Sequence, residues 1–120
     1  MEIPSFMLSG LYVKGSLRNT DAGVAFRLKN SLAAGTVTEV SRVKLGDTSH
    51  PLSDVVLKSG DTAMKASEIT PQNSVAFGVN VVLEVLIPGA KLPVGVQKLD
   101  LAASTKEYGA LNISVKDVVK

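Results

Sequence analysis

The chain has 120 residues, of which 45% are apolar and 20% are charged, a size and balance that exclude a disordered chain and suit one domain with one hydrophobic core. It contains no cysteine, which excludes disulfides, zinc-thiolate sites and thiol nucleophiles, so we expect a cytoplasmic protein. Thirteen basic and eleven acidic residues give a net charge of +2 and are scattered singly along the sequence, so we expect no nucleic acid partner.

The N-terminal segment, residues 1–10, is apolar but is too short to span a bilayer. Pro4, Ser9 and Gly10 interrupt it, and Glu2 stands where an export signal carries positive charge. We therefore expect neither export by that route nor a membrane anchor. We predict one domain that spans residues 1–120.

Two stretches near the N-terminus alternate between apolar and polar residues, at 11–18 and 24–29. In the first stretch the alternation places Leu11 and Val13 on one face and Tyr12 on the other. Residues 19–23 between the stretches are rich in turn formers, so we predict a β-hairpin. Asp21 is interpreted as a turn residue, because a single carboxylate is too few ligands for calcium.

Further strands are predicted at the spacing of an all-β domain, with turn residues in each gap. They span residues 36–45, 52–58, 62–66, 79–87, 96–104 and 110–119. The valine spacing slips between Val37 and Val43, which predicts a β-bulge. The one helical candidate is a single turn capped by Ser67 before Pro71. The predicted fold class is all-β: an antiparallel two-sheet β-sandwich of about seven to nine strands, with at most one short helical turn.

The stretch 79–87 is apolar on both faces. Its predicted inward set is Val79, Val81, Leu83, Val85 and Ile87. Val82 and Leu86 lie on the opposite face, where a loop, the N-terminal segment or another subunit could cover them. Their burial would contribute roughly 3 to 6 kcal/mol, so we expect them to be covered. This energy does not identify the element or subunit that covers them.

The aromatic residues are few. Phe26 and Phe77 are interpreted as core residues, and Tyr12 and Tyr108 as surface anchors. We predict Tyr12, Val82 and Leu86 as interface residues, in a homo-oligomer or against a larger protein subunit.

The supply of catalytic residues is small. The single histidine, His50, lies between a turn aspartate and a proline, and no nucleophile elbow accompanies it. Asp47 and His50 lack a third metal ligand nearby, and no pair among the acidic residues can be named. The glycines do not lie between a strand and a helix, as a phosphate-binding loop requires. We therefore predict no catalytic residue, no cofactor and no metal site.

Several short runs occur in the order known from one protein family. They are "GSLRN" at 15–19, "GVAFRLK" at 23–29, "VKLGD" at 43–47, "PLSDV" at 51–55 and "LPVGVQKLDL" at 92–101. In this order the chain resembles the small β-sandwich subunit of C-glycoside deglycosidases over residues 11–104. The resemblance implies a supporting role beside a larger barrel subunit that carries the metal and the chemistry. No catalytic residue is carried over.

The runs "MEIPSFMLSGLYVKGSL" and "KASEI" are also similar to short archaeal and bacterial proteins labelled hydroxymethylglutaryl-CoA reductase. That activity needs a nicotinamide site, a CoA site and a catalytic acid, lysine and histidine set over a far longer chain. We therefore do not expect the activity from this chain.

These observations favour a non-catalytic β-sandwich that works by assembly, either with copies of itself or as an accessory subunit of a larger enzyme. A second hypothesis is a module that encloses a small apolar ligand between its sheets. The abundance of valine, leucine and alanine, with few large aromatic residues, would leave room for such a ligand. The third hypothesis is an enzyme in its own right that uses His50.

Overall fold

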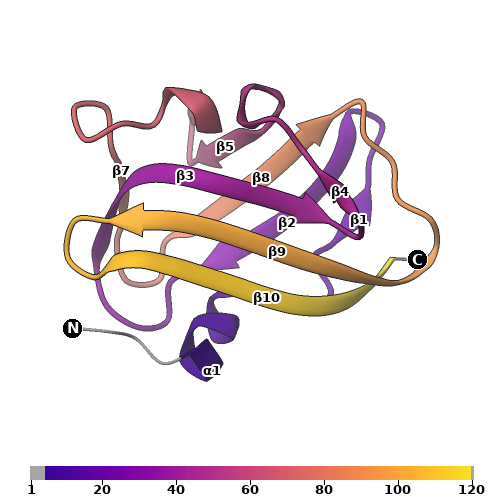
Figure 1. The fold of residues 1–120 in the computed structure, drawn as a ribbon, viewed down its shortest axis with the longest axis horizontal. Coiled ribbons are helices and arrows are strands. Elements are labelled where there is room, and N and C mark those ends of the chain that lie inside the picture. Colours follow the sequence, from indigo (N-terminus) through magenta and orange to yellow (C-terminus); the bar gives the residue numbers. More distant parts are fainter. Residues whose placement is uncertain (1–4, 120) are drawn as a thin grey trace.

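A computed structural model describes the backbone of residues 5–119 and the side chains of residues 7–119. Two antiparallel five-stranded sheets pack face to face, so the predicted all-β sandwich is confirmed (Figure 1). The first sheet has the order β1-β2-β8-β5-β6, with strands Arg18–Asn19, Gly23–Lys29, Val82–Pro88, Val56–Ser59 and Thr62–Lys65. The second sheet has the order β10-β9-β3-β4, with strands Gly109–Val119, Gly95–Thr105, Gly35–Leu45 and Thr48–Ser49, and β7 (Val75–Phe77) also pairs with β3.

Residues 5–119 form ten strands, where about seven to nine are predicted. The additional ones, β4 and β7, have two and three residues and are too short to show an alternating pattern. Helical turns are also more numerous than the single predicted one. They are α1 (Ser5–Leu8), η1 (Ser9–Leu11), η2 (Leu52–Asp54) and η3 (Ala66–Glu68).

The predicted helical turn corresponds to η3, although Ser67 lies inside it and does not cap it. The backbone N–H of Lys65 donates to Oε1 of Glu68 at 3.0 Å. No helix within residues 5–119 has the length and apolar character needed to cross a membrane.

The predicted hairpin is present, with its turn at residues 20–23. Thr20 closes this turn with its backbone and its hydroxyl. Its N–H donates to the carbonyl of Gly23 at 2.7 Å, and its Oγ1 accepts from the N–H groups of Ala22 and Gly23 at 3.2 and 3.1 Å. The turn thus supplies its own hydrogen bonds, and the sequence "RNTDAG" is structural.

The first strand of that hairpin is much shorter than predicted. Only Arg18–Asn19 forms β1, because Gly15 adopts φ +86° and turns the chain before it. This turn breaks the period of two, so the predicted outward position of Tyr12 is wrong. Tyr12 is 8% exposed and forms an isolated bridge with Leu28.

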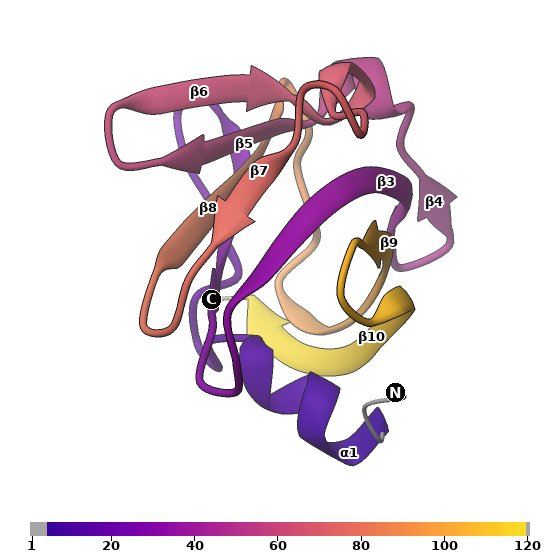
Figure 2. The same ribbon diagram turned by 90° about the vertical axis from the view of Figure 1, so that its left-hand side faces the viewer.

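The predicted β-bulge in the third strand is confirmed. Two register shifts between β3 and β9 occur at Val37/Glu39 and Val40/Arg42. Bulges bend a strand and increase its twist, and Figure 2 shows β3 arching over the interior.

Strand β8 begins at Val82, three residues later than predicted. Val79 is 52% exposed, and its predicted inward position is wrong. A turn precedes the strand here: Val81 donates to the carbonyl of Gly78 at 3.1 Å, and Asn80 adopts φ 67°. The rest of the predicted inward set is at least partly buried.

The core lies between the sheets and includes Phe26 and Phe77 as predicted, at 0% and 9% exposure. The described part of the N-terminal segment packs against β10, with Leu8 buried, and so lies beside the second sheet (Figure 1). The alternative that this part covers the outer face of β8 is therefore wrong. Residues 1–4 lie outside the described range.

Gly23 is the position where the hairpin depends most on glycine. Its φ is +149°, and an added Cβ would lie 2.1 Å from the carbonyl oxygen of Ile87. We expect Gly23→Ala to lower the free energy of unfolding by about 2 kcal/mol or more, because backbone must move to accept the methyl group. Urea unfolding measures this. Gly10→Ala is the control, since no atom lies within 4 Å of its added Cβ, and equal losses in both variants would contradict the prediction.

Candidate functional site

The outer face of the first sheet carries two of the three predicted interface residues. Leu86 of β8 lies between Ala25 of β2 and Val56 of β5, and Val82 lies opposite Lys29 of β2. Val82 is 43% exposed, while Leu86 is half-buried. Val82 therefore leaves apolar side-chain surface exposed on a central strand of the sheet.

Cations surround these apolar side chains. The strand residues that share this face include one acid, Glu84, and five basic residues: Arg18, Arg27, Lys29, Lys58 and Lys65. The carboxylate of Glu84 forms two ion pairs: its Oε1 lies 3.2 Å from a guanidinium nitrogen of Arg18, and its Oε2 lies 3.7 Å from Nε of Arg27. The face therefore has an excess of positive charge.

Sequence reasoning missed this charge cluster, because the five cations are separated along the chain and only the strand register brings them together. Arg27, Glu84 and Lys58 form one row across β2, β8 and β5. The alternating pattern of the strand that contains Glu84 did predict that Glu84 points outward. It could not predict which cations lie beside Glu84, because that depends on the order of the strands in the sheet.

Tyr12, the third predicted interface residue, lies inside the fold. Its hydroxyl donates a short hydrogen bond to the carboxylate of Asp117, which is 6% exposed. The same carboxylate accepts from the N–H groups of Gly15 and Val118, each at 2.8 Å. The predicted role of Tyr12 as a surface anchor is corrected to that of a buried link between the edge of the first sheet and β10.

The pKa values of Tyr12 and Asp117 both differ from their ordinary values. Burial raises the pKa of Tyr12 well above its ordinary value, and the hydrogen bond to Asp117 raises it further. Burial alone would raise the pKa of Asp117. The hydrogen bonds from Tyr12, Val118 and Gly15 outweigh that effect, so the pKa of Asp117 lies below its ordinary value.

The residues considered for catalysis are dispersed. His50 follows β4, where its backbone N–H donates to the carbonyl of Val43 at 2.9 Å, and its side chain lines a shallow depression with Arg42 and Leu52. The candidate acids lie on separate elements: Asp47, Asp54, Asp61, Glu84 and Asp100. No group of three His, Cys, Asp or Glu side chains in residues 5–119 could hold a metal ion.

A sequence model of one family matches almost the entire chain. It describes the N-terminal domain of hydroxymethylglutaryl-CoA reductase and covers residues 7–120. This domain is a non-catalytic region. The match supports the resemblance seen in "MEIPSFMLSGLYVKGSL" and gives no support to the likeness to deglycosidases. No curated protein matches the chain.

Tyr12→Phe removes the hydroxyl that donates to Asp117 and keeps the ring. We expect the variant to lose about 1.5–3 kcal/mol of unfolding free energy near neutral pH, as is usual for hydrogen bonds to charged groups. Urea unfolding followed by circular dichroism measures the loss. Tyr108→Phe, the same change at the other tyrosine of the chain, should lose much less.

The difference between wild type and Tyr12→Phe should also depend on pH. A raised pKa of Tyr12 means that its stabilisation is complete below about pH 10 and decreases above it. A lowered pKa of Asp117 means that its stabilisation is complete above about pH 4 and decreases as the carboxylate is protonated in acid. The difference should therefore be largest between these limits. A constant difference from acid to alkali would contradict the role of this pair.

Proposed function

The chain belongs to the hydroxymethylglutaryl-CoA reductase N-terminal domain family, and from this premise we propose that it is a non-catalytic accessory module that docks onto the catalytic part of such an enzyme. The observation that carries the proposal is the outer face of the first sheet, where exposed Val82 and half-buried Leu86 lie among five cations.

The charge of this face favours a different protein over a second copy of the chain. A two-fold symmetric dimer brings the same patch of both copies together. Here that contact would place Arg27, Lys29 and Lys58 of one copy near those of the other. Like charges opposed across an interface cost several kcal/mol in general. An acidic surface with a small apolar centre is the complementary partner.

The same face is poorly suited to nucleic acid. Glu84 pairs with Arg18 and Arg27, which lowers the positive charge that these two side chains could offer to a phosphate backbone. The strand residues on the face, which flank Val82 and Leu86 on β2, β8 and β5, include no aromatic ring on which a base could stack. The apolar centre therefore supports a protein partner.

The proposal is tested by titrating the chain into the purified catalytic part of a reductase from the same organism, with isothermal titration calorimetry. We expect saturable binding that weakens as salt is raised, because the cations contribute to it. Val82→Asp should weaken binding by about tenfold or more, since it places a desolvated negative charge in the apolar centre. A parallel titration with duplex DNA should show no comparable binding.

Val96→Asp is the matched control. Val96 is 67% exposed on the outer face of the other sheet, so the same change there should leave the affinity unaltered. Equal binding by wild type and Val82→Asp would overturn the assignment of this face. A stable homodimer of the chain alone that Val82→Asp dissociates, detected by sedimentation, would overturn the accessory role in favour of self-association.

A further inference from the structure

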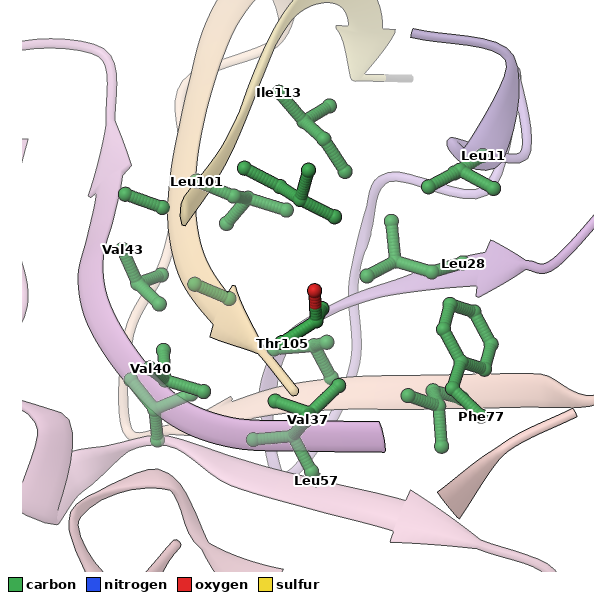
Figure 3. A pocket seen from close by; sticks show the side chains of 16 residues that line it. Leu11, Leu28, Val37, Val40, Val43, Leu57, Phe77, Leu101, Thr105 and Ile113 are labelled. Carbon is green, nitrogen blue, oxygen red and sulfur yellow. The ribbon is translucent and has the colours of Figure 1, made fainter. Parts of the chain in front are cut away.

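An apolar cavity of about 100 Å³ lies between the two sheets (Figure 3). Its walls come from both sheets: Leu57 and Leu28 belong to the first, and Val40 and Leu101 belong to the second. Figure 3 shows these side chains pointing toward a common space. For comparison, an engineered apolar cavity of about 150 Å³ in another protein stays dry and binds benzene.

The walls of the cavity carry almost no hydrogen-bonding groups that could bind a polar molecule. Thr105 is the one residue with a polar side chain among those that line the cavity. Its Oγ1 donates to the carbonyl of Gly109 at 3.1 Å and accepts from the N–H of Tyr108 at 2.9 Å. A buried water needs two to four polar partners, so the cavity favours an apolar occupant over water.

The backbone of β3 shapes this space. Val37 and Val40 line the cavity, and both register shifts between β3 and β9 occur beside them. The bulges bend β3 into the arch seen in Figure 2, which separates it from the first sheet. The cavity therefore follows from the path of the strand as well as from the size of its side chains.

A smaller hollow adjoins the cavity. This hollow has a volume of about 30 Å³ and shares five lining residues with the cavity, Phe77 and Leu111 among them. Leu32 and Tyr108, both partly buried, line the hollow and do not line the cavity. The Tyr108 ring covers Gly35, where an added Cβ would lie 3.8 Å from its Cε2 atom.

Both loops around the hollow are fixed to the sandwich. The buried amide of Asn30 donates to the carbonyls of Ala33 and Phe77 at 2.8 and 2.7 Å. The carboxylate of Glu107 accepts from the N–H and hydroxyl of Thr36 at 2.8 and 3.0 Å. The hollow therefore lies between segments that hydrogen bonds fix in place, and the partly buried Leu32 and Tyr108 side chains line it.

We propose that the interior of the sandwich binds a small uncharged aliphatic molecule, or the short aliphatic end of a longer one, which enters between Leu32 and Tyr108. The walls are aliphatic apart from the Phe77 ring and the Thr105 hydroxyl, so branched hydrocarbon groups fit them best. Filling the space would restore dispersion contacts that the lining side chains lack. This site is independent of the outer face of the first sheet.

Methyl-group NMR of the complete chain with cyclopentane as the probe tests the proposal. We expect saturable shifts of the methyl signals of Val40, Leu57 and Leu101. The methyl signals of Val94 and Val96, which are 77% and 67% exposed, should not shift. Tetrahydrofuran, a five-membered ring of similar size with an ether oxygen in place of one CH₂ group, should bind more weakly.

Ala103→Leu fills the cavity, because Ala103 lines it from β9. We expect this variant to bind cyclopentane about tenfold more weakly or worse, since the added atoms occupy the volume that the probe requires. Ala110→Leu is the matched control, because Ala110 is exposed on the outer face of the same sheet. Val43→Leu is a second filling variant if Ala103→Leu does not fold.

Unsaturable shifts, or shifts equal in wild type and both filling variants, would overturn the proposal. Equal weakening by Ala110→Leu would do the same.

Discussion

The structure depends on the burial of the inner faces of two sheets against each other. Phe26, Leu83 and Ile87 on the first sheet and Leu99 on the second are at most 1% exposed. Complete burial of each such side chain is worth about 1.5–3 kcal/mol. Because strand residues alternate between the two faces, this burial also dictates which side chains point outward. The inward positions of Leu83 and Ile87 thus direct Val82, Glu84 and Leu86 to the outer face.

The function proposed for the outer face is a consequence of this constraint. Val82 and Leu86 cannot point inward unless Leu83 and Ile87 leave the core. A shift of one residue in the pairing register of β8 would exchange its two faces. The two sheets are also joined by a polar contact. The buried pair of Tyr12 and Asp117 links the edge of the first sheet to β10. All buried side-chain nitrogen and oxygen atoms among the described residues have hydrogen-bond partners. The cavity is the exception to efficient packing, at a cost of about 2 kcal/mol by the usual volume relation.

The sequence allowed prediction of the elements that are long enough to display a period of two. Strands β2, β3, β9 and β10 have 7 or 11 residues and were predicted nearly to their ends, together with the bulge in β3. Tyr12 and Val79 were placed on the wrong side because turns at Gly15 and Asn80 interrupt the alternation. The charge cluster around Glu84 and the mouth of the cavity could not be predicted, since both depend on which strands and loops are neighbours in space.

We propose that the outer face of the first sheet binds the catalytic part of a reductase. Hydrogen–deuterium exchange of the chain, free and in complex with that part, can locate the contact. We expect slower exchange in β2, β5 and β8 on binding, with β9 and β10 unchanged. Protection confined to β9 and β10, or no protection in either sheet, would contradict it.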